Sequence, residues 1–265
     1  MKVCVIGNGG REHALAWRLS ISPSVTKVYA IPGSAAMSDC AELVGIDWQQ
    51  SDHLIRFLKD NHVDLVVVGP EAPLVAGLAD ALNAAGIPVF GPSKAAAQLE
   101  GSKVFAKDLM KKYKIPTAAY GVFHKVDEAK EFISQPGAPI VVKADGLAAG
   151  KGVVVAMTIE EANAAVEDML SGNRFGEAGS TVVIEEFMEG EEASLLAFVD
   201  GKTVVPMIAS QDHKRIFDGD KGPNTGGMGT YAPAPVLTAA LRDEAMKTIL
   251  EPMVAALEKE GMPYV

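Results

Sequence analysis

The sequence contains only two cysteines, and aromatic residues make up only 6% of its 265 residues. Cys4 lies within an apolar run, where a free thiol packs as a small hydrophobic side chain, and Cys40 has no evident partner. The sequence therefore offers no disulfide framework, which favours a reducing compartment. Because aromatic residues are scarce, the core must be built mainly from Val, Ile, Leu, Ala and Met.

Basic residues are also few, since the sequence has 24 Lys and Arg residues and 34 Asp and Glu residues, which gives a formal net charge of -10. This balance argues against sequence-independent binding to nucleic acid or to an anionic membrane. No apolar run approaches the roughly 20 residues of a membrane-spanning helix, and the N-terminus enters a strand pattern at once, without a signal-peptide layout. We therefore expect a cytoplasmic protein with no nucleic-acid or membrane partner and no evident obligate protein partner.

The first part of the chain alternates strand-like runs with helical patterns. The strand-like runs lie at residues 2–6, 25–30, 44–48, 63–68 and 87–90, and the main helical patterns at 11–20, 51–61 and 74–85. Strands that alternate with helices predict an α/β domain with a parallel sheet. A Gly-Pro-Ser turn at 91–93 precedes the domain boundary, which we place after residue 101.

The second part follows a different pattern. Strands near 120 and at 139–143, 152–157 and 181–186, with helices at 126–134 and 159–170, can form a separate α+β layer. Asp200-Gly201 predicts a hairpin, since both turn positions tolerate positive φ. The polar, Gly-rich stretch 210–235 is too long for an ordinary connection and predicts a functional or disordered loop. A helix at 238–260 follows, and a new strand is expected from residue 262.

The first glycine cluster, at residues 7–10, follows the first strand. Backbone N–H groups and the helix dipole can bind phosphate at such a turn. The cluster resembles a dinucleotide fingerprint, but Glu12 stands at the third glycine position, and no acidic residue ends the second strand to hold a ribose hydroxyl. The loop therefore favours a phosphate over NAD, with a tight turn without ligand as the alternative.

The segment 140–153 carries the sharpest signal. An apolar strand ends in Lys143, a loop of small residues follows through Gly150 to Gly152, and a second strand begins. Such a loop can approach the phosphates of a nucleotide closely. It is not a P-loop, because Gly152 stands where Ser or Thr would follow the lysine and the next element is a strand. A plain hairpin is the alternative, but it leaves a lysine at the end of an apolar strand unexplained.

Carboxylates follow two further strands. Glu71 lies beyond strand 63–68, at the edge where open α/β sheets bind ligands, and could accept hydrogen bonds from sugar hydroxyls. Favourable helix-dipole electrostatics explain it equally well. Strand 181–186 runs into a connector with several carboxylates, which a solvated acidic turn would also explain.

The order of these segments resembles the ATP-grasp ligases, in which a nucleotide lies between two α+β layers. Along its whole length the chain is similar to the phosphoribosylamine–glycine ligase family, also called glycinamide ribonucleotide synthetases. The resemblance rests on the joint order and spacing of residues 7–13, 69–74, 99–103, 143–153, 185–194, 211–215 and 222–229.

The resemblance implies a Rossmann-like N-terminal domain at 1–101 and an ATP-grasp α+β region at 102–265. Within that region it implies a small lid subdomain at about 120–190 and the start of the large layer at about 191–265. It also implies ATP, glycine and 5-phosphoribosylamine as substrates. ATP would phosphorylate the glycine carboxylate, and the amine would displace phosphate to give glycinamide ribonucleotide for purine biosynthesis.

The resemblance implies ATP-binding roles for residues in three segments. Lys103 and Lys143 would bind the phosphates under the loop that includes Gly150 and Gly152. The adenine edge would meet the connector of Glu185, Glu186, Phe187 and Met188, mainly through backbone groups. Glu192 would accept hydrogen bonds from the ribose hydroxyls.

The resemblance also implies that residues of both domains bind the substrates glycine and phosphoribosylamine. Phosphoribosylamine would contact Gly9, Gly10, Arg11 and Glu71. Asp212 is the candidate for the glycine ammonium, and Lys214 or Arg215 for a phosphate or carboxylate, so that these three join Lys143 as catalytic candidates. Asn224, Gly226 and Gly227 would complete the acceptor loop. A solvated charge run is the alternative for residues 212–215.

One departure concerns the metal. ATP-grasp ligases hold Mg²⁺, or Mn²⁺, with Glu and Asn side chains on late strands, and residues 201–265 contain no strand-borne Glu-x-Asn arrangement. We therefore expect no metal ligand in this chain, ligands beyond Val265, an incomplete C-terminal layer and an inactive N-terminal portion. The alternatives are a nucleotide-binding module without catalysis, or another ATP-grasp ligase of purine synthesis.

We predict that the chain does not use NAD, because Glu12 fills the third glycine position and the second strand ends without an acidic residue. Titration with NAD should give no saturable signal. Saturable micromolar binding that phosphoribosyl compounds displace would contradict this prediction.

Overall fold

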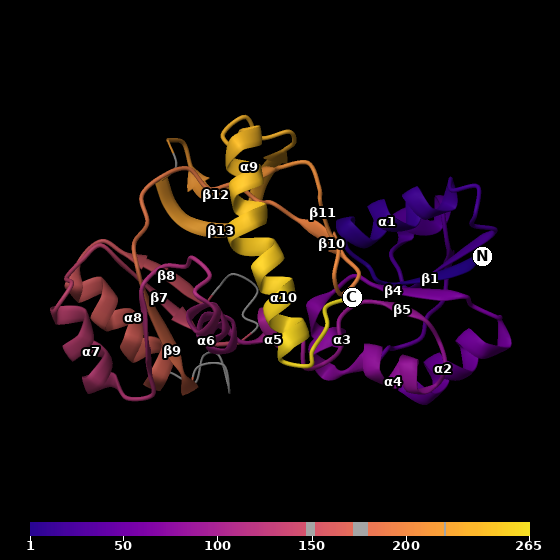
Figure 1. The fold of residues 1–265 in the computed structure, drawn as a ribbon, viewed down its shortest axis with the longest axis horizontal. Coiled ribbons are helices and arrows are strands. Elements are labelled where there is room, and N and C mark those ends of the chain that lie inside the picture. Colours follow the sequence, from indigo (N-terminus) through magenta and orange to yellow (C-terminus); the bar gives the residue numbers. More distant parts are fainter. Residues whose placement is uncertain (147–151, 172–179, 220) are drawn as a thin grey trace. The chain divides into compact units, whose positions relative to one another are not determined.

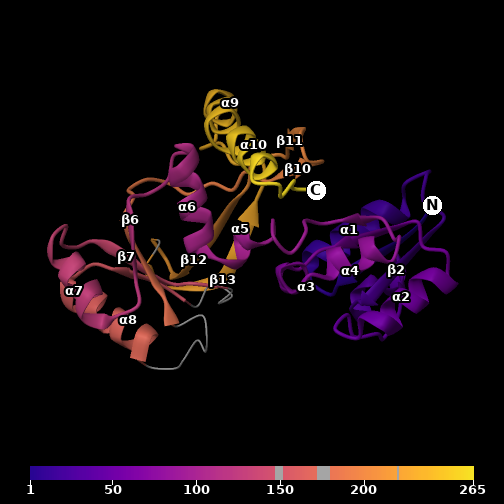
Figure 2. The same cartoon turned by 60° about the horizontal axis from the view of Figure 1, so that its bottom comes forward.

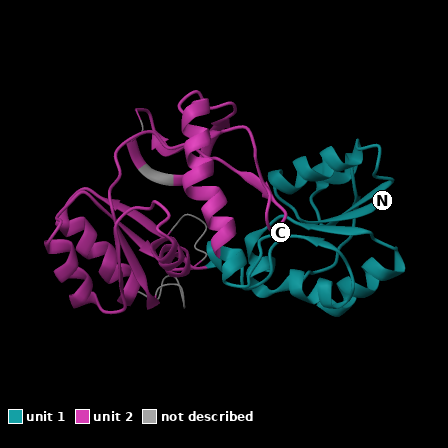
Figure 3. Cartoon of the chain, in the orientation of Figure 1, with its two compact units in different colours: residues 1–101, 257–265 teal, residues 102–256 magenta. Residues whose placement is uncertain are grey.

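The computed structural model describes residues 1–146, 152–171, 180–219 and 221–265. These residues form two compact units (Figure 3). Unit 1 comprises residues 1–101 and 257–265, and unit 2 comprises residues 102–256. Each unit has its own sheet and its own hydrophobic core.

Unit 1 contains a five-stranded parallel sheet with the order β3-β2-β1-β4-β5. The strands are β1 (Lys2–Gly7), β2 (Lys27–Pro32), β3 (Glu42–Leu43), β4 (Leu65–Val68) and β5 (Val89–Phe90). The chain builds outward from β1 first to one side and then, from β4, to the other. The order therefore reverses between β1 and β4, and open α/β sheets bind their ligands at the carboxyl ends of such strands.

Helices cover both faces of this sheet (Figure 1). They are α1 (Gly10–Ser20), α2 (Ser51–Asp60), α3 (Glu71–Ala76), α4 (Leu78–Ala84) and α5 (Gln98–Gly101), with a short 3-10 turn at Ala35–Asp39. In β1, Cys4 and Ile6 pack into the core beneath α2 and α4, whereas Val3 and Val5 pack with residues of α1 on the other face. A strand buried on both faces must be apolar throughout, which explains the continuous run at 3–6.

Two predictions for unit 1 were wrong in detail. The predicted helix 74–85 is two helices, because Gly77 adopts φ 100° and ends α3 in the left-handed region. The predicted strand 44–48 does not form, because the strand at this edge of the sheet is Glu42–Leu43, just before it. Residues 45–48 form a loop from which Ile46 and Trp48 still pack against the core, and this alternation produced a strand-like pattern.

Unit 2 contains a four-stranded antiparallel sheet with the order β6-β9-β7-β8. The strands are β6 (Tyr120–Phe123), β7 (Ile140–Ala144), β8 (Val153–Ala156) and β9 (Val182–Glu186), and α6 (Lys103–Tyr113) precedes them. Helices α7 (Val126–Ser134) and α8 (Ile159–Ser171) lie side by side along the sheet (Figure 2).

Alternation along the central strands divides their side chains between two faces. Val142 and Ala144 of β7, and Val182 and Ile184 of β9, belong to the core shared with α7 and α8. Because successive side chains of a strand point to opposite faces, Lys143 and Glu185 lie on the other face.

Two hairpins and a long helical segment complete unit 2. The hairpins are β10 (Ala197–Val199) with β11 (Val204–Pro206), and β12 (Gln211–Phe217) with β13 (Lys221–Tyr231). Helices α9 (Ala239–Ala245) and α10 (Glu251–Lys259) are joined by a π-helical segment at Met246–Leu250, and α10 continues into unit 1. Among the described residues, no helix is long and apolar enough to cross a membrane.

The hairpin at Asp200-Gly201 was predicted correctly, with Gly201 at φ 93°. The predicted loop at 210–235 was wrong, because most of it forms β12 and β13. No described residue of either strand is buried and their pairing is interrupted by register shifts, so the sequence shows no apolar alternation there. The strand expected from residue 262 does not form in the described structure.

Ile184→Ala should lower the free energy of unfolding of the chain by about 2–5 kcal/mol, because Ile184 is fully buried at the centre of the unit 2 core. Ile208→Ala is the matched control, since Ile208 is 70% exposed in the same unit. Urea unfolding measures both changes. Equal losses in the two variants would contradict this core assignment.

Candidate functional site

A buried carboxylate fills the glycine-rich turn of unit 1. Glu12, on the first turn of α1, is only 3% exposed. Its carboxylate accepts hydrogen bonds from Gly9 N at 2.8 Å and from Arg11 Nε at 2.8 Å. The N–H group of Gly9 is therefore already bonded within the chain.

The neighbouring glycines make room for this side chain. A Cβ atom would lie 2.5 Å from Glu12 at Gly7, 2.9 Å at Gly9 and 2.3 Å at Gly69. A side chain at any of these three positions would displace the Glu12 side chain. At Gly10, by contrast, a Cβ atom would meet nothing within 4 Å, so this part of the turn borders open space.

The structure brings together two predicted substrate residues, Arg11 and Glu71. Arg11 Nη1 lies 2.9 Å from Glu71 Oε1, and both side chains are about half exposed. Burial opposes ionisation of Glu71, but the hydrogen bond and the charge of Arg11 outweigh it and lower the pKa of the Glu71 carboxyl group. Arg11 is held in turn by Glu12, so a buried acid orients an exposed ion pair.

A cavity of about 420 Å³ lies at the carboxyl ends of β1, β2 and β4. Its polar lining includes Asn8 and Asp47, and Trp48 contributes an aromatic side chain. Asn8 belongs to the predicted glycine cluster, whereas Asp47 and Trp48 were missed because the sequence pattern placed them inside a strand. The cavity lies at the sheet edge where the order reverses, which is the expected ligand position for this architecture.

In unit 2, three charged side chains meet on the sheet face opposite α7 and α8. Lys143 Nζ lies 2.9 Å from Glu185 Oε2, and Lys107 Nζ lies 3.0 Å from the same oxygen. Lys143 and Glu185 are diagonal neighbours on paired strands, since Val183 stands opposite Lys143. Lys107 comes from α6 and was missed in the sequence, because an amphipathic helix with many lysines gives no signal for one buried lysine.

Asp145 ties the end of β7 to the start of α6. Its carboxylate accepts hydrogen bonds from Lys103 N at 2.6 Å, from Val104 N at 3.2 Å and from the Ser102 hydroxyl at 3.1 Å. Lys103 Nζ also donates to Gly146 O at 2.9 Å. The two lysines predicted to hold phosphates therefore extend from segments that one aspartate joins.

A cavity of about 380 Å³ joins the connector after β9 to strand β12. Phe187, Met188 and Glu192 line one side, and Asp212 and Lys214 line the other. The predicted nucleotide connector and the predicted acceptor string therefore share one cavity.

Within this cavity, Lys214 Nζ lies 3.1 Å from Glu192 Oε2 and 3.8 Å from Asp212 Oδ2. The cavity therefore presents an ammonium group between two carboxylates. Such a lining suits polar ligands that carry both charges.

The other predicted residues take several positions. Arg215 Nη1 donates to Gly222 O at 2.7 Å, which fixes the guanidinium across the β12–β13 hairpin. Gly226 and Gly227 lie on β13, and Gly227 N donates to the Thr225 hydroxyl. Gly152 O accepts from Ala144 N at 2.8 Å where β7 and β8 meet. Gly150 and the side chain of Asn224 lie outside the described residues.

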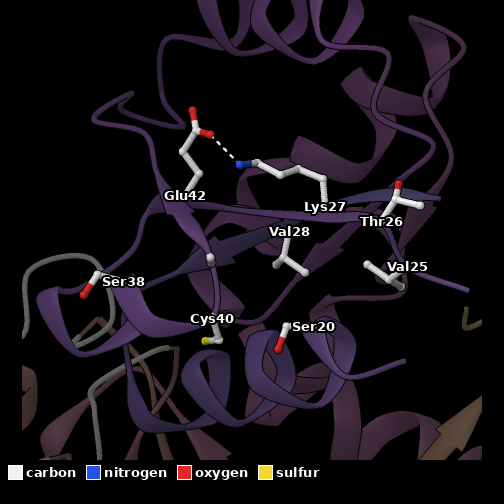
Figure 4. Close-up of a pocket in the computed structure, with 9 residues that line it drawn as sticks. Ser20, Val25, Thr26, Lys27, Val28, Ser38, Cys40 and Glu42 are labelled. Atoms are coloured by element: carbon white, nitrogen blue, oxygen red, sulfur yellow. Dashed lines mark ion pairs between the residues drawn. The ribbon is translucent and has the colours of Figure 1, made fainter. Parts of the chain in front are cut away.

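A further cavity of about 410 Å³ lies at the opposite, amino-terminal ends of β2 and β3 (Figure 4). Its polar side chains have partners within the chain. The hydroxyls of Ser20, Thr26 and Ser38 and the thiol of Cys40 donate to backbone carbonyls, and Lys27 pairs with Glu42. We assign no ligand to it.

A doubly wound parallel unit followed by a four-stranded antiparallel layer with a strand-end lysine fits the class of ATP-grasp proteins, and an ATP-grasp domain model matches residues 101–265. A solved biotin carboxylase domain of Hydrogenobacter thermophilus 2-oxoglutarate carboxylase, in complex with MgADP, has this fold. It superposes with a TM-score of 0.75 at 18% identity, over 96% of this chain and 58% of that one. The predicted fold class is thus confirmed.

Within this class, the chain belongs to the phosphoribosylglycinamide synthetase family. The family's N domain matches residues 1–100, and its ATP-grasp (A) domain matches residues 101–265. This confirms the family resemblance inferred from the motifs.

Curated relatives include phosphoribosylamine–glycine ligases of Brucella melitensis and Agrobacterium fabrum, which are 58% and 56% identical over 264 residues. A crystal structure of the ligase from Thermotoga maritima superposes with a TM-score of 0.85 at 33% identity, over 100% of this chain and 63% of that one. All of this chain, but only 62% of the length of these curated relatives, is matched.

Glu12→Gln should lower the free energy of unfolding by about 1–3 kcal/mol, because a buried carboxylate would lose its charge-assisted hydrogen bond from Arg11. Glu42→Gln is the control, since Glu42 forms an exposed pair with Lys27 in the same unit. Urea unfolding should separate the two variants. If Glu12→Gln were as stable as Glu42→Gln, Glu12 would not organise the glycine turn.

Proposed function

We propose that the chain contributes the nucleotide site and acceptor surfaces of a phosphoribosylamine–glycine ligase. The main supporting observation is the position of Lys143. Its ammonium group lies at the end of a buried strand, pairs with Glu185, and belongs to a side chain that is 26% exposed. The family membership and the relatives at 53–58% identity support this reading. They also favour it over other ATP-grasp ligases of purine synthesis, such as the N5-carboxyaminoimidazole ribonucleotide synthetase of Thermus thermophilus, which is 23% identical.

In the proposed reaction, a glycine carboxylate oxygen attacks the γ-phosphorus of ATP and ADP leaves. The resulting glycyl phosphate has a good leaving group, which the free carboxylate lacks. The amine of 5-phosphoribosylamine then attacks the acyl carbon, phosphate departs, and the nitrogen loses a proton. The products are glycinamide ribonucleotide, ADP and phosphate.

This chain's residues would act mainly by positioning and by charge. Lys103 and Lys143 would neutralise negative charge on the phosphates, and Asp145 would set their separation by joining α6 to β7. The connector at 186–188 would bind adenine through backbone groups, and Glu192 would accept from the ribose. These roles rest on the family resemblance and on the cavity that the connector lines.

The acceptor substrates would occupy two surfaces. Glycine would meet Asp212 through its ammonium group and Lys214 or Arg215 through its carboxylate. Phosphoribosylamine would meet Gly10, Arg11 and Glu71 at the carboxyl edge of the parallel sheet. Because Gly9 N is bonded to Glu12, we assign the anion contact in this turn to Gly10 and Arg11.

A divalent cation, Mg²⁺ or Mn²⁺, would lower the charge on the β- and γ-phosphates in such a reaction. Among the side chains that the structure describes, no group of three or more His, Cys, Asp or Glu residues is arranged to hold a metal ion. We therefore route no step of the proposed reaction through a metal ion.

The second candidate is a nucleotide-binding module. The chain could bind a nucleotide without catalysing ligation. An assay of ADP release separates the candidates. ADP release that requires both glycine and 5-phosphoribosylamine would establish ligation by this chain, whereas nucleotide binding without release would favour the second candidate.

Lys143→Ala should weaken ADP binding by about 1.5–3 kcal/mol, since a charge-assisted hydrogen bond to phosphate would be lost. Isothermal titration calorimetry measures this change. Lys130→Ala is the control, because Lys130 also pairs with a glutamate but lies on α7, on the far face of the same sheet. Unchanged ADP affinity in Lys143→Ala would mean that this lysine has only a structural role.

A further inference from the structure

Lys107 is a buried lysine to which the proposed reaction gives no role. It is 8% exposed and lies on α6, one helical turn after Lys103. Its ammonium group contacts Glu185 Oε2 at 3.0 Å, Thr117 Oγ1 at 2.7 Å and Ala118 O at 3.4 Å. A lysine has three N–H donors, so all of them have partners within the chain. Lys107 therefore acts on the site through another residue.

That residue is Glu185. The same carboxylate oxygen, Oε2, is shared by Lys107 from the buried side and by Lys143 from the more exposed side. Two ammonium groups thus face one carboxylate, and one positive charge remains uncompensated. Without Lys107, Glu185 would neutralise Lys143, and the group that faces an incoming phosphate would carry no net charge.

We propose that Lys107 is a positioning residue for the nucleotide phosphates. Lys107 pairs with Glu185 on the buried side of the carboxylate. Glu185 therefore orients the Lys143 ammonium group without cancelling its charge. This inference rests on the proposed role of Lys143 in phosphate binding. The opposing explanation is that Lys107 only anchors α6 to the sheet through a buried ion pair.

The two explanations differ in which ligands they affect. If Lys107 acts by positioning, loss of its charge should weaken binding of ADP, which carries phosphates, and leave binding of adenosine unchanged. Loss of an anchor for α6 would distort the site and weaken both ligands. The comparison of ADP with adenosine therefore separates positioning from simple anchoring.

The test uses the full chain and measures the dissociation constants of ADP and adenosine by calorimetry and by competition. Lys107→Met should weaken ADP about tenfold, which corresponds to about 1.4 kcal/mol, and leave adenosine unchanged. Lys111→Met, an exposed lysine one turn further along α6, is the matched control and should change neither constant.

Two further variants separate the effect of the charge at position 107 from an effect on folding. Lys107→Arg keeps the positive charge and should retain most of the ADP affinity, whereas Lys107→Gln keeps a hydrogen-bond donor without charge and should bind ADP as weakly as Lys107→Met. ADP affinity should follow the charge at position 107, even where thermal unfolding shows a different order of stability among the variants.

Unchanged ADP affinity in Lys107→Met and Lys107→Gln, or parallel losses for ADP and adenosine, would overturn the positioning role and leave the proposed function intact. Failure of the wild-type chain to bind ADP would overturn the proposed function and this inference together. Weaker ADP binding in Lys107→Arg, equal to that of Lys107→Gln, would also overturn it.

Discussion

A single carboxylate oxygen, Oε2 of Glu185, lies within 3.0 Å of two ammonium groups and joins three elements of unit 2. Burying a carboxylate is costly unless it is paired, so this position is stable only while α6, β7 and β9 bring their charged groups together. The neighbouring side chain, Ile184, points into the core beneath α7 and α8. Packing on one face of the sheet therefore fixes the direction of the charged group on the other.

Unit 1 also contains a buried carboxylate that pairs with a more exposed basic side chain. Glu12 is buried in the glycine turn, where its carboxylate accepts from Gly9 N and from Arg11. In both units a buried acid orients a basic side chain that stays partly exposed, Arg11 in one and Lys143 in the other. The basic groups proposed to meet substrate are thus held by partners that solvent hardly reaches.

Sequence patterns predicted elements well where one face of an element is buried. The helix at 126–134 and the strands around Lys143 were recognised, because apolar residues recur there at regular spacing. The hairpin of β12 and β13 was missed, since no described residue of either strand is buried and their glycines and charges give no apolar alternation. Likewise, Trp48 packs on the core from a loop, and its alternating neighbours produced the pattern of a strand.

The sequence by itself determined the class of fold, the position of the glycine turn and the lysine that ends an apolar strand, because these depend on local spacing and on the order of short motifs. Only the tertiary structure decided which charges share a partner. Glu12 lies in the glycine turn that the sequence pattern predicted as a phosphate site, and Lys107 contacts Glu185 across 78 positions of the chain. Such contacts depend on how helices and strands pack, and packing between distant segments leaves no periodic signal in the sequence.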